Sequence, residues 1–229
     1  QNSDQEDVNR ALLPVSELQQ LAVDFKERLG APHLLGLRFD PQPPAGGEKG
    51  QRIWLPFHLT NQVIWRYDEV SHSYLRYQDD GTGKNFMQMT DRLNGEPLAF
   101  ENVVILFAPH HYYDETLFNI DLMYITRLPA LLFRDGRVYS IYWTTGNQEY
   151  ERTTGRLRPI RFVDAEGQPF PLRPGQTWVE LVSQYTAYNE TLDSEDYKTL
   201  MGKPQPGSGN WAVHFYVPEF EPTPEWLGE

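Results

Sequence analysis

Two apolar runs flank an Asp-Gly pair in residues 129–143. Asp135-Gly136 suits a two-residue type I′ turn, because both central residues of that turn need positive φ. Counting outwards from the turn predicts these facing pairs: Arg134 and Arg137, Phe133 and Val138, Leu132 and Tyr139, Leu131 and Ser140, Ala130 and Ile141. Both faces of the predicted hairpin are apolar, so we expect it to lie centrally in a sheet that is covered on both sides.

Short apolar or alternating runs elsewhere predict further strands. They are residues 53–57, 63–67, 103–107, 120–125, 160–163, 169–172, 177–182 and 211–217. A second hairpin is predicted within residues 67–77, with its turn near residues 69–73. The chain is therefore predicted to be mainly β, with twisted antiparallel sheets that form a sandwich or a partly closed barrel.

One α-helix is predicted near the start of the chain. Ser16 is a suitable N-cap, Gln19 completes a capping box, and Gly30 occurs where a C′ residue belongs. The apolar residues at helical spacing are Leu18, Leu21, Ala22, Phe25 and Leu29. We expect this apolar stripe to pack on the sheet.

Composition narrows the class of protein. Aromatic residues make up 14% of the chain, enough for a globular interior, while 18 prolines and 17 glycines favour the short segments of an all-β fold. The net charge of -12 argues against a nucleic-acid partner and against an anionic membrane surface, because both need clustered Lys and Arg. No apolar run reaches the roughly 18 to 20 residues of a transmembrane helix. The absence of cysteine fits an exported bacterial protein without disulfides, and fits a cytosolic one nearly as well.

Several sequence blocks occur in a fixed order along the predicted β region. They are WRYD at 65–68, YLRY at 74–77, NVVILF at 102–107, LLFRDGRV at 131–138, and RFVD at 161–164 followed by PGQTWVEL at 174–181. Together they resemble the C-terminal domain of the YerB-like lipoprotein family, a bacterial domain family of unknown function. The resemblance covers residues 36–182 and implies an extracytoplasmic, envelope-associated protein that is tethered by a lipid on an N-terminal cysteine. It implies no activity.

The resemblance also suggests a division of the chain. Members of the family carry a larger N-terminal domain, so we expect residues 1–35, a polar segment and the helix, to be the end of an upstream domain. Residues 36–182 are then the β domain, and residues 183–229 are a C-terminal extension with one extra strand. The upstream domain is expected to have been trimmed or cleaved, and it would carry the lipid. Once cleaved, it is one candidate partner.

The most reactive-looking cluster follows an apolar strand, at residues 110–115. His110, His111 and Asp114 are residue types that bind zinc, and zinc with an open coordination position can catalyse hydrolysis. On an extended chain, however, the two histidines point to opposite sides. A solvated loop at the end of a strand is therefore the alternative to a metal site. The sequence holds no nucleophile elbow, P-loop or dinucleotide fingerprint, and we expect no cofactor.

Aromatic residues in or beside the predicted strands give a second candidate site. Rings with polar edges can hold a sugar or a peptide in a groove, and the candidates for ligand binding are Trp65, Tyr67, Tyr139 and Trp143. Sheets use the same residue types for packing, which is the alternative. Exposure of Tyr139 and Trp143 side by side would favour binding, and burial would favour packing.

Three functions are open on the sequence alone. The first is a non-catalytic exported module, in the bacterial cell envelope or at the cell surface, that binds a protein partner or an envelope polymer. The second is a metal-assisted hydrolase that uses residues 110–115. The third is a structural subunit of a cell-surface assembly that joins identical subunits through its ends. The sequence favours the first, and with it the absence of enzyme activity.

Overall fold

The structure is a computed structural model that describes residues 15–24, 36–112, 118–123, 125–146, 149, 152–153, 158–193 and 204–218. The chain divides into two compact units, Gln1–Leu34 and Leu35–Glu229. Within the described ranges, none of the helices has both the length and the apolar character needed to cross a bilayer.

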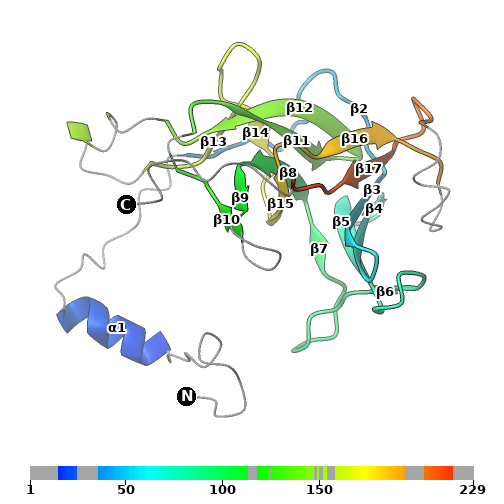
Figure 1. Ribbon diagram of the computed structural model, residues 1–229, viewed down its shortest axis with the longest axis horizontal. Helices are drawn as coiled ribbons and strands as arrows, with labels where there is room; N and C mark the ends of the chain where they lie inside the picture. Colours follow the sequence, from blue (N-terminus) through cyan, green and yellow to red (C-terminus); the bar gives the residue numbers. More distant parts are fainter. Residues whose placement is uncertain are drawn as a thin grey trace. The chain divides into compact units, whose positions relative to one another are not determined.

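The first unit contains the predicted helix, α1 (Val15–Asp24) (Figure 1). Ser16 lies inside the first turn of α1 and does not precede the helix as its N-cap. Phe25, Leu29 and Gly30, which the sequence assigned to the end of this helix, lie outside the described residues. The packing of α1 on a sheet stays a prediction.

The second unit is built from two main β-sheets. The six-stranded sheet contains β2 (Glu48–Lys49), β8 (Asn102–Ala108), β11 (Leu128–Arg134), β12 (Arg137–Thr144), β13 (Arg161–Val163) and β15 (Thr177–Ser183). The seven-stranded sheet contains β3 (Arg52–His58), β4 (Asn61–Asp68), β5 (Ser73–Asp79), β6 (Phe86–Gln88), β7 (Ala99–Phe100), β16 (Ala187–Glu190) and β17 (Asn210–His214). Two small pairs accompany them: β1 (Arg38–Phe39) with β14 (Pro171–Leu172), and β9 (His110–Tyr112) with β10 (Phe118–Ile120).

The hairpin predicted around Asp135-Gly136 is confirmed. β11 and β12 pair antiparallel with Arg134 opposite Arg137, and the remaining predicted pairs follow in the same register. The φ values of 54° at Asp135 and 68° at Gly136 are those that a type I′ turn requires. The second predicted hairpin is also present, because β4 and β5 pair with Asp68 opposite Ser73. Both reversals therefore follow from local sequence.

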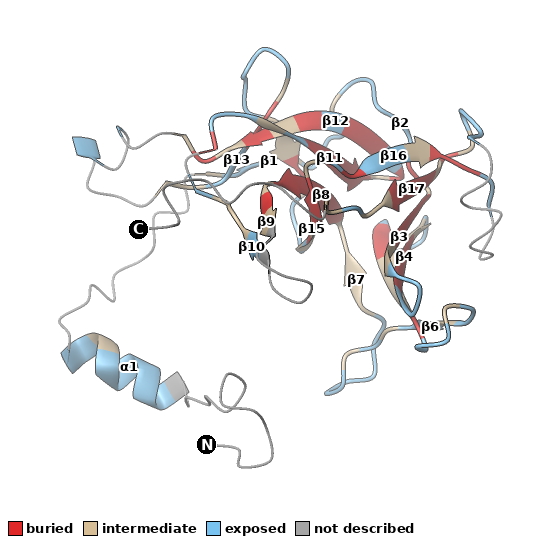
Figure 2. Cartoon of the chain, in the orientation of Figure 1, coloured by how far each residue is buried: buried red, intermediate tan, exposed pale blue. Residues whose placement is uncertain are grey.

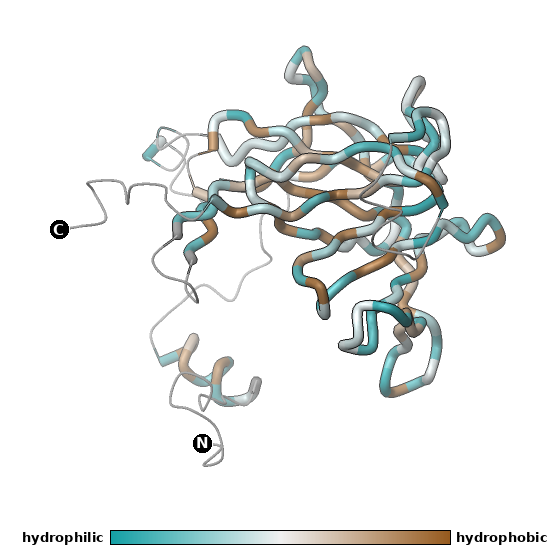
Figure 3. The backbone as a smooth tube through the Cα atoms, turned by 45° about the vertical axis from the view of Figure 1, so that its right-hand side comes forward, coloured by the Kyte–Doolittle hydropathy of each residue, from teal (hydrophilic) through white to brown (hydrophobic). Residues whose placement is uncertain are grey.

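The two faces of the β11–β12 hairpin belong to different hydrophobic clusters, as predicted. Leu131, Phe133 and Val138 face an inner core shared by both sheets, together with Ile53, Leu55, Val63, Trp65, Tyr74, Val103, Ile105, Phe107, Val182, Trp211 and Val213. The opposite face packs in an outer cluster: Val104, Leu106, Ala108, Ile125, Ala130, Leu132, Tyr139, Ile141, Trp143, Phe162 and Leu172. Figures 2 and 3 show the buried, apolar central strands that result. The second unit is thus a β-sandwich, and among the described strands neither sheet closes on itself.

The predicted fold class is confirmed, but the sheets are mixed. β15 pairs parallel with β8, and β17 pairs parallel with β3. A parallel neighbour needs a long connection, and its direction depends on contacts between segments that are far apart in the chain. Alternation within a strand carries no information on that direction, which is why the sequence predicted antiparallel pairing throughout.

Several predicted strands are wrong in their extent: β17 ends at His214 and not at Val217, and β14 begins at Pro171 and not at Pro169. Residues 120–125 were expected to form a single strand, whereas β10 ends at Ile120 and the described residues after it lie outside strands. The side chain of Asp121 accepts a hydrogen bond from the backbone N–H of Met123 at 2.7 Å. Such a local bond competes with pairing in a sheet, so the alternating pattern ends in a turn.

Candidate functional site

A polar groove of about 450 Å³ lies where the turns of the two hairpins meet at one end of the sandwich. We call it the hairpin-tip groove. Its lining residues are Lys49, Gln51, Tyr67, Glu69, His72, Asp135, Gly136 and Arg137. The β4–β5 turn comes from the seven-stranded sheet, and the β11–β12 turn and β2 come from the six-stranded sheet. Its volume falls within the range of small-molecule sites in proteins.

Gly136 sets the floor of the groove through a close approach. A Cβ atom at this position would lie 2.8 Å from both the Gln51 side chain and the Tyr67 ring. The carbonyl oxygen of Gly136 accepts hydrogen bonds from the backbone N–H of Gly50 at 2.9 Å and from the Gln51 amide at 3.0 Å. These bonds fix the turn against the segment that precedes β3, so the groove has a rigid base.

The carboxylate of Asp135 is held by two guanidinium groups. Arg134, which is fully buried, donates from Nε to one oxygen at 2.8 Å, and Arg173 donates to the other at 3.0 Å. Arg134 also donates to the backbone carbonyls of Pro171 and Asp40. The negative charge of Asp135 is therefore more than balanced inside the protein, because each carboxylate oxygen meets a separate cation.

Tyr67 and His72 form a polar pair on the other wall. The Tyr67 hydroxyl lies 3.2 Å from Nδ1 of His72, and Arg173 donates to the carbonyl of His72 at 2.8 Å. Burial raises the pKa of the Tyr67 phenol, and the charge of Asp135 raises it further. The phenol therefore stays protonated at neutral pH and can donate to Nδ1, which leaves the imidazole proton on Nε2.

His72 and Asp135 share an unusual backbone conformation. Among the described residues, they are the two non-glycine residues with positive φ, at 54° each. Both line the hairpin-tip groove. Left-handed conformations in non-glycine residues are uncommon, and such residues cluster at functional sites.

Two cations complete the groove. Lys49 on β2 and Arg137 on β12 are direct cross-strand partners, and both side chains are exposed. One guanidinium nitrogen of Arg137 lies 3.2 Å and 3.3 Å from the carbonyl oxygens of Gly46 and Gly47. Within the described parts of the chain, neither cation forms an ion pair with a carboxylate.

Of the four aromatic candidates, Tyr67 lines the groove and the other three lie in the interior. Trp65 and Trp143 are fully buried, and their indole N–H groups donate to Glu180 at 3.0 Å and to the carbonyl of Phe107 at 2.9 Å. Tyr139 is 4% exposed and donates to the carbonyl of Pro44. These placements match the packing alternative for Trp65, Tyr139 and Trp143, because a buried ring has no free face for a ligand.

Trp65 belongs to a polar cluster inside the sandwich. Burial raises the pKa of Glu180 on β15, whereas the hydrogen bond from Trp65 and the nearby guanidinium of Arg76 lower it. Arg76 lies over the Trp178 ring, 5.0 Å from its centroid. Because Trp65 and Arg76 come from one sheet and Glu180 and Trp178 from the other, the cluster ties the sheets together.

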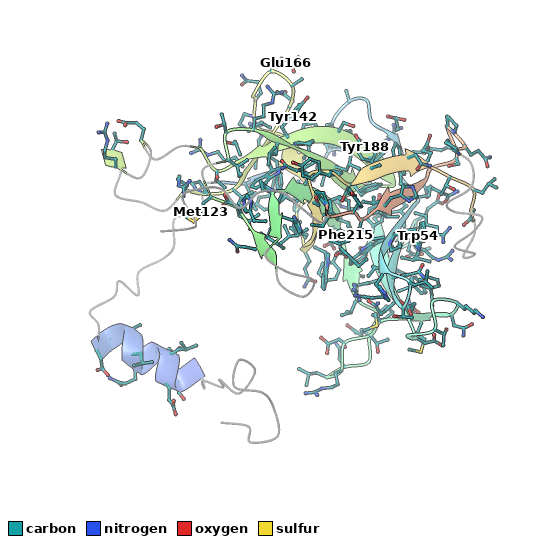
Figure 4. All side chains as sticks on the ribbon, in the orientation of Figure 1. Trp54, Met123, Tyr142, Glu166, Tyr188 and Phe215 are labelled. Carbon is teal, nitrogen blue, oxygen red and sulfur yellow. The ribbon has the colours of Figure 1, made fainter. Side chains whose placement is uncertain are left out.

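Exposed aromatic side chains also occur away from the groove. Tyr188 on β16 is 41% exposed, and its ring packs against Phe107 and Trp211 (Figure 4). Tyr142 on β12 lies under the guanidinium of Arg127, 3.7 Å from the ring centroid (Figure 4). Each of these two rings packs against a neighbouring side chain, so they do not form a row of uncovered rings on which a ligand could stack.

Both histidines of the predicted cluster lie on β9. His110 is buried in β9, with Nδ1 2.9 Å from the carbonyl oxygen of Ala108, and burial lowers its pKa. Asp114 lies outside the described residues. Within the described ranges, no three His, Asp or Glu side chains come together as a metal site would require. The metal site at His110, His111 and Asp114, and the hydrolase built on it, stay predictions.

Comparison with known proteins identifies the family. Residues 53–179 match the family described as "Protein of unknown function (DUF3048) C-terminal domain". The chain belongs to this family. The resemblance expected from the sequence blocks is confirmed, because the "Putative lipoprotein YerB" of Bacillus subtilis (strain 168) is 30% identical over 131 residues. That match covers 57% of this chain and 34% of the relative, so the chain corresponds to about a third of it.

A solved structure supports the same relationship. The crystal structure of the YerB protein from Bacillus subtilis superposes with a TM-score of 0.52 at 25% sequence identity. The superposition covers 79% of this chain and 55% of that chain.

The DUF3048 match contains most of the groove. Tyr67, His72, Asp135 and Arg137 lie within residues 53–179, and Lys49 precedes them. Sequence analysis selected Tyr67 as a ligand-binding residue but missed Lys49, His72 and Arg137. The predicted turns were the available signal, since both hairpins were located correctly, but nothing in the sequence places the two turns side by side.

Proposed function

We propose that this chain is a non-catalytic module of the bacterial cell envelope that binds an envelope polymer or a protein partner in the hairpin-tip groove. The observation that carries the proposal is the groove itself, with two cations and a Tyr–His pair fixed on rigid turns. Support for the location comes from the relative that is named as a lipoprotein. In this proposal a lipid carried by a region outside the given sequence tethers the full-length protein, as the name of the relative suggests.

The chemistry of the groove favours binding over catalysis. Asp135 is the carboxylate at its base, and both of its oxygens are engaged by guanidinium groups. These oxygens already accept hydrogen bonds within the protein, which is the arrangement of a structural carboxylate. Lys49, Gln51, Tyr67 and Arg137 supply hydrogen-bond donors around it, which suits recognition of a ligand.

Co-sedimentation tests the proposal. The chain is mixed with washed, insoluble cell-wall material and, separately, with immobilised envelope proteins from the same bacterium. We expect saturable binding to one of the two fractions that weakens for Tyr67→Ala combined with His72→Ala. A Leu93→Ala variant, at a highly exposed loop position outside the groove, serves as the control. Absence of binding to both fractions would contradict a binding module.

The sheet edges support a second candidate function, a structural subunit. Among the described strands, β16 pairs with β17 alone and β15 pairs with β8 alone, so each ends its sheet. An unpaired edge can accept a strand from an identical subunit or from the cleaved N-terminal domain. Light scattering over a concentration series tests this candidate, and a mass that stays at one chain throughout would contradict self-assembly.

A further inference from the structure

The cross-strand pair formed by Lys49 and Arg137 is electrostatically unfavourable in isolation. The two residues are direct partners in the antiparallel β2–β12 register, so their side chains leave the same face of the sheet. Like charges that face each other in this way are destabilising. Arg137 is stabilised in part by the carbonyls of Gly46 and Gly47, whereas Lys49 forms no ion pair within the described residues. An anion between the two cations would remove this cost.

Two cations, Lys49 and Arg137, and two carboxylates, Glu69 and Asp135, line the groove. Arg134, Asp135 and Arg173 form a closed group of two cations and one anion, so this group adds positive charge to the base of the groove. Glu69 is the remaining carboxylate that lines it, against Lys49 and Arg137. The whole chain, in contrast, has a net charge of -12. Because Arg134 and Arg173 engage Asp135, Glu69 is the lining carboxylate left to oppose Lys49 and Arg137, so an anionic ligand can be accommodated between these two cations.

The neutral groups of the groove fit the same ligand. The Tyr67 hydroxyl lies 3.2 Å from Nδ1 of His72, and in the tautomer that accepts this hydrogen bond Nε2 of His72 carries a proton that can be donated to a bound group. Arg137 retains further N–H donors beyond those used on Gly46 and Gly47. Phosphate and carboxylate groups accept several hydrogen bonds from such donors, and charge makes these bonds shorter and stronger.

We propose that the hairpin-tip groove binds an anionic group, a phosphate or a carboxylate, carried by a cell-envelope polymer and placed between Lys49 and Arg137. This inference rests on the proposed function and specifies the chemistry of its ligand. The overall negative charge of the chain opposes approach at long range, but at physiological ionic strength charges are screened beyond about 8 Å. The charges that line the groove therefore dominate once the ligand is in contact.

Calorimetric titration of the full chain tests this inference. The probes are a poly(glycerol phosphate) oligomer, an oligogalacturonate and a neutral dextran of similar length. We expect one of the two anionic probes to bind, the dextran to show no heat of binding, and the affinity to fall as NaCl is raised. Comparison of the two anionic probes shows whether the site prefers a phosphate or a carboxylate group. Binding of the dextran with equal affinity, or of neither anion, would overturn the inference.

The decisive variant is Lys49→Glu, with Lys84→Glu as the matched control. Lys84 is exposed between β5 and β6 and does not line the groove, so both variants change the net charge equally. We expect Lys49→Glu to weaken anion binding at least about tenfold, and Lys84→Glu to leave it within about twofold of the original. Equal effects of the two variants would overturn the inference, since bulk charge alone would explain them.

A stability measurement excludes misfolding as the explanation. Lys49→Glu replaces a like-charge pair with an opposite-charge pair across β2 and β12, so its urea midpoint should rise while binding falls. A fall in both would overturn the inference. The proposed function is judged separately: if Lys49→Glu still binds the envelope fraction as the original chain does, the anion site fails and the binding module stands.

Discussion

Gly136 illustrates how a single residue without a side chain can hold a site together. It has a φ of 68°, and an added Cβ would lie 2.8 Å from the Tyr67 ring. We predict that Gly136→Ala lowers the free energy of unfolding by about 2–4 kcal/mol, because a left-handed conformation and a steric clash both add cost. Urea denaturation measures the change.

Gly81→Ala is the matched control for this prediction. Gly81 also has a positive φ, of 88°, but an added Cβ there would meet no atom within 4 Å. The expected loss is therefore about 1 kcal/mol, from conformation alone. Equal losses at the two positions would show that close packing against Tyr67 contributes nothing.

Glu180 gives the stability of the protein a specific pH dependence. Burial holds its pKa above the ordinary value in the folded chain, so the folded state binds this proton more tightly than the unfolded state. The resulting stabilisation is complete below the ordinary pKa of a glutamic acid and is lost as the pH rises through the raised pKa. Glu180→Gln keeps an oxygen for the Trp65 indole but cannot ionise. We therefore predict that the stability of the original chain relative to Glu180→Gln falls as the pH rises above 4.5, the ordinary pKa of this group.

Urea denaturation of both proteins across that pH range is the measurement. A constant difference in the free energy of unfolding would contradict the raised pKa. If the original chain gained stability relative to Glu180→Gln as the pH rose, the pKa of Glu180 would be lowered by folding and not raised.

At the scale of elements, the β11–β12 turn reverses the chain and also carries the carboxylate that Arg134 and Arg173 engage. A substitution at Asp135 can separate these two roles. Asn is as suitable as Asp in a type I′ turn, but it lacks the charge that Arg134 and Arg173 engage. Asp135→Asn should therefore preserve the hairpin yet cost about 3 kcal/mol, because the buried guanidinium of Arg134 loses its carboxylate. Circular dichroism would verify the fold, and urea denaturation would give the loss.

Asp164→Asn provides the comparison. Asp164 also lies in a turn, where one carboxylate oxygen accepts backbone N–H groups of Glu166 and Gln168. An amide oxygen can accept the same bonds, so we expect a loss below about 1 kcal/mol. A similar loss at both positions would mean that the ion pairs of Asp135 add no stability.

The elements also mark the limit of prediction from sequence. The β11–β12 register and the β4–β5 turn depend on neighbouring residues, and both were predicted correctly. The parallel placement of β15 beside β8 depends on a distant segment, and the sequence did not predict it. The candidate site follows the same rule: Tyr67 was found from its residue type, whereas Lys49 becomes relevant through its position opposite Arg137, on a strand of two residues.

At the scale of the whole molecule, the β unit holds a core of its own. Its three buried clusters use residues between Ile53 and Val213. We predict that a chain that begins at residue 36 folds cooperatively, because these clusters stay complete. Its urea midpoint should be lower than that of the full chain, since the apolar stripe of α1 is expected to add about 1.5–3 kcal/mol for each side chain that it buries on the sheet.

Two outcomes would contradict parts of this prediction. Failure of the shortened chain to fold would show that the β unit needs the first 35 residues. An unchanged midpoint would show that α1 does not pack on the sheet.

The pairing of β17 with β3 has a consequence for how the chain reaches its native state. β3 begins at Arg52 and β17 at Asn210, so the seven-stranded sheet joins segments that lie far apart in the chain. Closing so long a loop is entropically costly, and domains rich in such contacts fold slowly, in about milliseconds to seconds. The seven-stranded sheet can therefore be completed only after the segment that contains β17 has been synthesised, so β3 waits for its parallel neighbour.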